Sequence, residues 1–246
     1  MWYNGGVGDG FSNTKIYLRG TKNMKILSDF SDVIAQGFTG YTERASKHFG
    51  VKPEVFGSCF KKHLPTLWDL CRGKMCEMAF WHELAHDGRE AGVPMTAGEL
   101  RQLFHENMQV PMPGTVELYK RIQQYPVKAV RCSEIAVGRP EIVVVSDHIK
   151  EMVPLLHQWY PEFFQMVKKE FWSCDIGAIK ADPLFFKTVL TELGGEPDDY
   201  LTVDDAPQNI AAATAAGIPA IHYENSEQLE GAMASIGFGF APKADN

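Results

Sequence analysis

The stretch LTVDDAPQNIAAATAAGIPAIH, residues 201–222, decides the fold that the sequence predicts. Its β-branched start at 201–203 indicates a strand, its alanine-rich part at 208–216 a helix, and its end at 219–222 a second strand. Strands that alternate with helices form a parallel sheet covered by helices, and such sheets bind ligands beyond the carboxyl ends of their strands. Polar residues directly after a strand are therefore the first candidates for a functional site.

The same alternation extends towards the N-terminus, except in one long segment. Strands are expected at 25–28 and 141–145, and helices at 117–124, 148–159 and 183–193. In this segment, from about Tyr41 to Gln109, apolar residues recur at mixed three- and four-residue steps, which is typical of helices. We therefore predict an α/β protein with a Rossmann-like parallel sheet core and an inserted α-helical cap domain. The expected bounds are 24–40 and 111–246 for the core, 41–110 for the cap and 1–23 for a flexible N-terminal tail. The segment 125–140 is long for a connection and receives no role.

Composition excludes some classes of protein. The formal charge of −7 argues against a large nucleic-acid interface, which needs clustered Lys and Arg. Five cysteines without regular spacing indicate thiols in a reducing compartment. No stretch approaches the roughly 20 apolar residues that cross a bilayer, and no secretory signal pattern opens the chain. A cytoplasmic protein without a membrane or nucleic-acid partner is expected, while the oligomeric state stays open.

Five side chains with the chemistry of a phosphate site stand at the ends of expected strands or in the loops beside them. They are Asp29, Ser146, Lys180, Asp204 and Asp205. A carboxylate can act as a nucleophile towards phosphorus if fixed donors and a cation neutralise the phosphoryl oxygens. Clustered aspartates repel one another without a cation, and Mg²⁺ prefers hard oxygen ligands. The set predicts a magnesium-dependent phosphate site, although a lone Asp at a strand end is more often a cap or turn residue.

In order and spacing, these positions resemble the four motifs of the haloacid dehalogenase superfamily. The motifs are Asp29-Phe-Ser-Asp-Val-Ile34, Ser146 after its strand, Lys180-Ala-Asp-Pro183 and Val203-Asp-Asp-Ala-Pro-Gln-Asn209. The resemblance spans 24–223 and is closest to sugar-phosphate phosphatases and the phosphatase half of epoxide hydrolases. It implies hydrolysis of a small phosphorylated metabolite, such as a sugar phosphate, through an aspartyl-phosphate.

The resemblance also implies a role for each matching residue. Asp29 would be the nucleophile and a magnesium ligand, together with the main-chain carbonyl of Ser31. Asp204 and Asp205 would complete the protein's share of the metal shell. Ser146 would bind a phosphoryl oxygen, Lys180 would balance the charge beside the nucleophile, and Asn209 would hold the last loop in shape.

Three positions depart from the family pattern: Ser31, Asp147, and Ala181, which replaces the usual Pro after the lysine. Ser31 stands where most phosphatases of the family have a second Asp that protonates the leaving oxygen, and a hydroxyl cannot do so at neutral pH. This leaves two alternatives open: a haloacid dehalogenase, whose leaving halide needs no proton, or a catalytically impaired phosphate-binding protein. Asp32, one residue further, could be recruited by an unusual loop. Asp147 replaces a common Asn and is equally explained as the N-cap of a helix from His148, a residue expected to be structural or solvated.

The motif His82-Glu-Leu-Ala-His86 matches that of zinc proteases, in which two histidines one helical turn apart bind zinc. Glu106 stands at a distance that could supply a third ligand. The neighbouring Phe80, Trp81 and Leu84 instead indicate a packed helix. We therefore prefer the structural interpretation of this motif.

Overall fold

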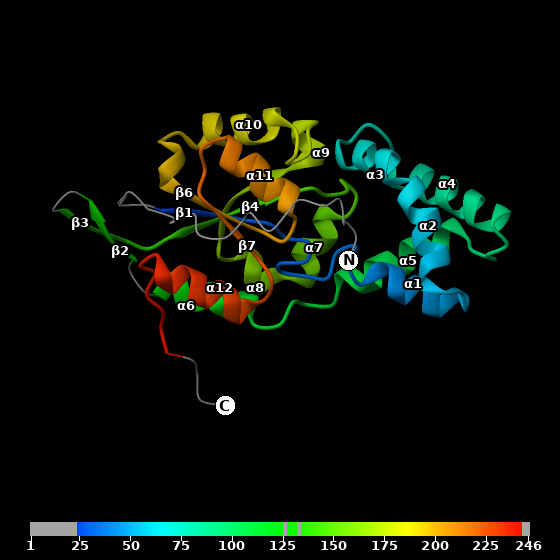
Figure 1. The fold of residues 1–246 in the computed structure, drawn as a ribbon, viewed down its shortest axis with the longest axis horizontal. Helices are drawn as coiled ribbons and strands as arrows, with labels where there is room; N and C mark the ends of the chain where they lie inside the picture. The colour runs from blue at the N-terminus through cyan, green and yellow to red at the C-terminus, as the bar shows by residue number, and fades with distance from the viewer. Residues whose placement is uncertain (1–23, 125–126, 132–133, 243–246) are drawn as a thin grey trace.

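A parallel sheet of five strands lies at the centre of the protein (Figure 1). In the computed structural model, which describes residues 24–124, 127–131 and 134–242, the strand order is β5-β4-β1-β6-β7. The strands are β1 (Lys25–Ser28), β4 (Glu141–Ser146), β5 (Val167–Trp172), β6 (Tyr200–Asp204) and β7 (Ala220–His222). Because β1 pairs with β4 on one side and β6 on the other, three predicted site loops meet at one edge. The predicted α/β class is confirmed, whereas the predicted tail 1–23 lies outside the described residues.

Both faces of the sheet are buried, as the short apolar strands require. Ile26, Val144 and Leu201 belong to the hydrophobic cluster on one face. Their chain neighbours Leu27 and Val143 belong to the cluster on the opposite face. Successive side chains of a strand point to opposite faces, and a parallel sheet is normally covered on both. The carboxyl edge is thus the natural place for polar groups.

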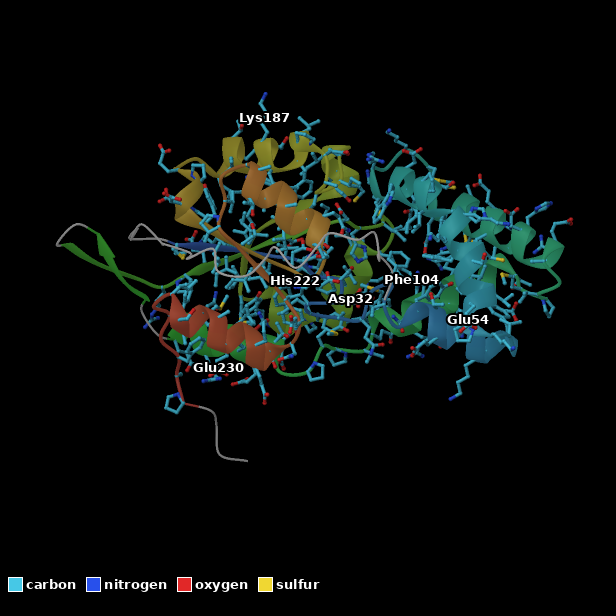
Figure 2. All side chains as sticks on the ribbon, viewed as in Figure 1. Asp32, Glu54, Phe104, Lys187, His222 and Glu230 are labelled. Carbon is cyan, nitrogen blue, oxygen red and sulfur yellow. The ribbon has the colours of Figure 1, made fainter. Side chains whose placement is uncertain are left out.

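Helices cover the two faces of the sheet (Figure 1). One face packs against α6 (Thr115–Gln124), α7 (Val153–Trp159), α8 (Pro161–Phe164) and α12 (Ser226–Ser235). The other packs against α10 (Pro183–Leu193) and α11 (Pro207–Ala215), with α9 (Ser173–Ile176) beside them. Lys187 on α10 and Glu230 on α12 accordingly lie on opposite sides of the sheet in Figure 2.

Residues 41–110 contain helices joined by short loops and turns. The five helices are α1 (Tyr41–Phe49), α2 (Pro53–Lys62), α3 (Leu64–Cys71), α4 (Glu77–Glu90) and α5 (Ala97–Met108). They lie together at one end of the molecule in Figure 1, around a buried aromatic core that includes Tyr41, Trp81 and Phe104. This core continues into the hydrophobic cluster on one face of the sheet. The helical segment is therefore packed onto the sheet.

The predicted helix 148–159 is wrong over its first half. Helix α7 begins only at Val153, with Met152 as N-cap and a proline in its first turn. Before it, the backbone N–H of His148 donates to Ser173 Oγ at 2.9 Å, and that of Ile149 donates to His148 Nδ1 at 3.0 Å. Such bonds to side chains compete with helical ones. Residues 147–152 therefore form a loop at the end of β4.

Edge strand β5 and a two-stranded hairpin are among the elements without a counterpart in the sequence-based expectations. Edge strand β5 carries Lys168, Lys169 and Glu170, which interrupt the apolar pattern expected for a buried strand and are typical of a sheet edge. The segment without a role contains the antiparallel strands β2 (Val127–Arg131) and β3 (Glu134–Gly138). In Figure 1 this hairpin lies at the opposite end of the molecule from α1–α5.

Candidate active site

The nucleophile predicted from the sequence lies at the centre of the carboxyl edge of the sheet. The backbone N–H of Asp29 donates to the carbonyl of Val203 at 2.9 Å, which extends the pairing of β1 with β6 by one residue. On the other side of β1, strand β4 ends at Ser146. Three chain segments that are far apart in sequence therefore bring Asp29, Ser146 and Asp204 to one edge.

The predicted aspartates converge. Asp29, Asp204 and Asp205 each offer a carboxylate oxygen, and these oxygens all lie within 4.8 Å of one another. Asp29 and Asp204 are buried, while Asp205 is partly buried. Within the described ranges this is the only group of three or more metal-binding side chains with such close ligand atoms. The structure therefore brings together the three side chains that the sequence predicted as magnesium ligands.

Lys180 is the cation of this cluster. Its Nζ lies 2.5 Å from Asp29 Oδ2 and 2.6 Å from Asp204 Oδ2, and the side chain is buried. Burial by itself lowers the pKa of Lys180, but the charges of Asp204, Asp29 and Asp147 outweigh burial and hold the pKa above its usual value. Lys180 therefore carries its positive charge throughout the physiological pH range.

One lysine does not balance three carboxylates. Burial, followed by the charge of a neighbouring aspartate, raises the pKa of both Asp204 and Asp205, although Lys180 acts in the opposite direction on each. Excess negative charge in a buried place is stabilised by a bound cation. The residues present therefore fit a divalent metal ion by charge and by donor type.

The two adjacent aspartates differ in their hydrogen bonds. Asp204 Oδ1 accepts from the backbone N–H of Ala206 at 2.9 Å and from Asn209 Nδ2 at 3.0 Å. No hydrogen-bond donor among the described residues reaches the carboxylate of Asp205. Asp205 thus offers free carboxylate oxygens, whereas Asp204 is fixed by the loop. The contact of Asn209 is the one expected for a residue that shapes this loop.

Ser146 carries one of the buried hydroxyls that lack a partner within the described residues. It is fully buried at the end of β4, and its Oγ has no hydrogen-bond partner among the residues that the structure describes. Buried polar groups normally have partners. A phosphoryl oxygen beside Asp29 would supply the missing one.

Asp147 has a different role from the helix cap expected as one alternative. No helix begins here, and Asp147 Oδ1 accepts the backbone N–H of Lys180 at 2.8 Å. Burial raises the pKa of Asp147 to about 7, against the opposing charge of Lys180. Asp147 therefore positions the loop that carries the lysine, a contact between residues 33 positions apart that the sequence does not reveal.

A second positioning contact is a chain of hydrogen bonds from α6 to the backbone of the predicted nucleophile. The Tyr119 hydroxyl on α6 donates to Ser28 Oγ at 2.9 Å, and Ser28 Oγ donates to the carbonyl of Asp29 at 2.7 Å. All three residues are buried, so this chain of hydrogen bonds fixes the backbone of the nucleophile. No motif points to Tyr119, which lies 91 positions from Ser28.

The carboxylate of Asp32 forms hydrogen bonds within the loop that follows Asp29. Asp32 has a left-handed backbone with φ 58°, and its carboxylate accepts from the backbone N–H of Gly37 and the hydroxyl of Thr39, both at 2.9 Å. Burial raises the pKa of Asp32 despite these bonds. Ser31 pairs through its backbone with Ala35 in an isolated bridge. The carboxylate of Asp32 therefore closes the loop around Ser31.

The zinc-protease motif does not form a metal site in this structure. His82 and His86 lie exposed on α4, in a shallow depression with His63, Glu83 and Asp87. His63 and His86 both face the carboxylate of Asp87, at 3.2 and 3.4 Å. These residues are not among the described groups whose ligand atoms converge for a metal. The structural interpretation of the motif agrees with this geometry.

Comparisons with known proteins agree with the fold. No protein-family model matches the sequence. A predicted HAD-like hydrolase from Porphyromonas gingivalis superposes with a TM-score of 0.62 at 18% identity, covering 87% of this chain and 97% of its own. A HAD family enzyme from Bacteroides thetaiotaomicron, solved as a magnesium complex, gives 0.61 at 14% identity, covering 87% and 99%. The L-2-haloacid dehalogenase of Xanthobacter autotrophicus gives 0.60 at 13% identity, covering 87% and 82%. The chain has the fold of the haloacid dehalogenase-like hydrolases.

One curated relative shares part of the sequence. Flavin mononucleotide hydrolase 1 of Arabidopsis thaliana is 36% identical over 67 residues. The match spans 27% of this chain and 27% of that protein. Separately, no helix in the described part of the chain is long and apolar enough to cross a membrane.

Proposed function

We propose that the chain is a magnesium-dependent phosphatase that hydrolyses a small phosphorylated metabolite through Asp29. The observation that carries the proposal is the convergence of Asp29, Asp204 and Asp205 around Lys180, beside the unpartnered hydroxyl of Ser146. Two relatives support it by name: a structural neighbour solved with magnesium and inorganic phosphate, and the flavin mononucleotide hydrolase. The proposed metal ligands are Asp29, Asp204 and Asp205 with the main-chain carbonyl of Ser31.

The reaction would take two steps. A carboxylate oxygen of Asp29 forms a bond to phosphorus while the bond from phosphorus to the ester oxygen breaks, which leaves an aspartyl-phosphate and an alkoxide. Water then attacks this phosphorus, releases inorganic phosphate and restores the carboxylate. Ser146 donates a hydrogen bond to a phosphoryl oxygen, and Lys180 holds Asp29 in place and offsets its charge. A bound Mg²⁺ supplies further neutralisation of the phosphoryl oxygens.

Ser31 shapes the expected substrate range. Because a serine hydroxyl does not act as a general acid at neutral pH, the departing alkoxide takes its proton from water. Esters with acidic leaving groups are then favoured over simple sugar phosphates. General acid catalysis contributes about 10²–10⁴-fold to such reactions, so the penalty on poor leaving groups is measurable.

The helical segment 41–110 is proposed as the cap that covers bound substrate. It contacts the site loops through Arg72, which forms a bidentate ion pair with Asp182 at 2.9 and 3.1 Å. Asp182 in turn accepts the backbone N–H of Ile179, next to Lys180. Closing such a segment over substrate would exclude water from phosphoryl transfer.

The direct test is turnover of p-nitrophenyl phosphate with Mg²⁺, followed by a panel containing flavin mononucleotide and sugar phosphates. Activity is expected in the wild type, absent in Asp29→Asn, and unchanged in His82→Ala on the exposed face of α4. Activity that survives in Asp29→Asn would overturn the assignment of the nucleophile. Activity lost in His82→Ala but kept in Asp29→Asn would instead favour zinc chemistry.

A second candidate is a haloacid dehalogenase that uses Asp29 on a carbon–halogen bond. Ser31 favours it, because a leaving halide needs no proton. The three converging aspartates oppose it, because displacement of a halide from carbon forms no additional phosphoryl charge for a metal to neutralise. Chloride release from 2-chloropropionate, without any turnover of phosphate esters, would select this candidate. Magnesium-dependent phosphate binding without either turnover would select a catalytically impaired phosphate-binding protein.

A further inference from the structure

His148 stands two residues after Ser146 and is held rigidly at the carboxyl edge of the sheet. Its backbone N–H donates to Ser173 Oγ at 2.9 Å, and Ser173 Oγ donates to the carbonyl of Cys71 at 2.7 Å. These bonds tie the loop after β4 to α9 and to the end of α3 in the helical segment. His148 is therefore fixed where the sheet and the helical segment meet.

The imidazole ring of His148 is also fixed. It packs edge-on against Trp172, with ring centroids 5.6 Å apart, and against Phe30 at 6.2 Å. Its Nδ1 accepts the backbone N–H of Ile149 at 3.0 Å. Because Nδ1 is an acceptor, the ring proton of the neutral imidazole is on Nε2. Nε2–H is thus a donor with a defined direction.

That donor has no acceptor. His148 is only 2% exposed, and its Nε2 has no hydrogen-bond partner within the described parts of the chain. Leaving a buried donor unpaired costs stability, and nearly all such groups in proteins are paired. Burial lowers the pKa of His148 to about 4, although the charges of Asp29 and Glu77 act in the opposite direction. The ring is therefore a neutral donor at physiological pH.

The surroundings of His148 indicate what the missing acceptor is. The charged groups that act on it are Asp29, Lys180 and Glu77. Glu77 already accepts three side-chain bonds of its own, and the two carboxylate oxygens of Asp29 accept from Phe30 and Lys180. A ligand bound beside Asp29, whose charge acts on the ring, would supply a further acceptor.

We propose that His148 is a substrate-binding residue whose Nε2–H donates a hydrogen bond to an oxygen of the phosphate group held beside Asp29. This inference rests on the proposed phosphatase function. Ser146 at the end of β4 would then approach the phosphate with a hydroxyl, and His148 in the loop that follows with a ring N–H. The neutral ring donates a hydrogen bond without transferring its proton, so it strengthens binding but does not replace the acid absent at Ser31.

The test compares phosphate binding with stability in three variants. His148→Phe keeps the aromatic ring between Phe30 and Trp172 but removes the donor, and His148→Gln restores an N–H near the position of Nε2. His157→Phe is the matched control, because His157 stacks on Phe164 at 3.8 Å in the same aromatic region and is 42% exposed in α7. Binding of inorganic phosphate with Mg²⁺ is measured by titration calorimetry, and stability by thermal unfolding without phosphate.

We expect His148→Phe to weaken phosphate binding by about threefold to tenfold, the size of one hydrogen bond, with a melting temperature equal to or above that of the wild type. His148→Gln should recover most of the affinity, and His157→Phe should bind like the wild type. A lower melting temperature in His148→Phe with unchanged phosphate affinity would show a structural ring and overturn the inference.

The inference and the function on which it rests fail in different ways. If the wild type neither binds phosphate with Mg²⁺ nor turns over phosphate esters, the proposed function and the inference are both wrong. If the wild type binds and hydrolyses phosphate esters while His148→Phe binds equally well, only the role of His148 is wrong. Weakened binding in His148→Phe and His148→Gln alike, with reduced stability in both, would also overturn it.

Discussion

Two buried carboxylate centres of this protein differ in how their charge is compensated. In the helical segment, Glu77 is 2% exposed and accepts from Trp81 Nε1 at 3.1 Å, Arg101 Nε at 2.7 Å and His105 Nε2 at 3.1 Å. At the carboxyl edge of the sheet, three aspartates lie together, and one lysine contacts two of them, Asp29 and Asp204. The first centre is complete within the protein, while the second has more negative charge than the protein offsets.

The directions of the pKa shifts follow this difference. Burial raises the pKa of Glu77, but its bonds to His105, Arg101 and Trp81 outweigh burial and hold the pKa below the usual value. For Asp205 burial raises the pKa, the charge of Asp204 raises it further, and the result lies well above the usual value. A compensated carboxylate stabilises a fold, whereas an uncompensated one is a place for a cation.

Removing Glu77 is expected to have the largest effect on stability. In Glu77→Ala the cation of Arg101 and the donors of Trp81 and His105 lose their acceptor in the interior of the helical segment. Breaking a buried ion pair costs about 3–5 kcal/mol, and the partial exposure of Arg101 places this one near the lower end. Urea unfolding measures the loss, and an unchanged free energy of unfolding would mean that Glu77 is not a structural centre.

Magnesium is expected to stabilise the sheet-edge centre and not the centre at Glu77. At a Mg²⁺ concentration about 100 times Kd, the free energy of unfolding should rise by about 2.7 kcal/mol. The rise should depend on pH, because the ligands must be ionised. Thermal unfolding with Mg²⁺ and with chelator, at pH 7.5 and pH 5, measures both effects. Equal stabilisation at the two pH values would contradict binding to these carboxylates.

The stability of the metal-free protein also depends on pH, and the sign of this dependence follows from the raised pKa values. Asp147 titrates in the unfolded chain near its usual pKa of 3.8 but at about 7 in the fold. Between these values the folded state holds a proton that the unfolded state releases, so the metal-free protein loses stability as pH rises through this window. The lowered pKa of Glu77 acts in the opposite direction, since its contribution is lost as pH falls.

The smallest of the three effects is expected for Asp205→Asn, and its sign is opposite to that of Glu77→Ala. Removing one of the three aspartate charges should stabilise the metal-free protein by about 0.5–2 kcal/mol, as happens when a strained functional site is relieved. The same variant should lose the stabilisation by Mg²⁺ and the turnover of phosphate esters. A destabilised Asp205→Asn protein would show that this carboxylate supports the fold, and the contrast with Glu77 would then be wrong.

The sequence predicts the residues of the candidate site better than the hydrogen bonds that position them. Asp29, Ser146, Lys180 and Asp204 are identifiable because each follows a local strand or loop pattern, and the parallel sheet then brings them together. The bonds that position them, such as the one from Tyr119 to Ser28, join residues with no shared pattern. Their partners are decided by packing between layers, which periodicity does not encode.

The same limit applies to the fold. The apolar strands β1, β4 and β6 are predictable because they are buried on both faces, whereas β5 is an edge strand with three consecutive charged residues, Lys168, Lys169 and Glu170. Helix α7 begins later than the sequence pattern predicts, because bonds to side chains replace helical ones at His148 and Ile149. Local competition of this kind depends on tertiary partners such as Ser173.

The central place of β1 in the sheet has a consequence for synthesis on the ribosome. Lys25 pairs with Glu141 and with Tyr200, so neither of the strands that flank β1 in the described sheet exists until at least 116 further residues have been made. At about 5–20 residues per second this wait is roughly 6 to 23 s. The helices of 41–110 pair with near neighbours along the chain and form much faster. The nascent chain is therefore expected to order its helical segment first and to assemble the catalytic edge only when β6 emerges.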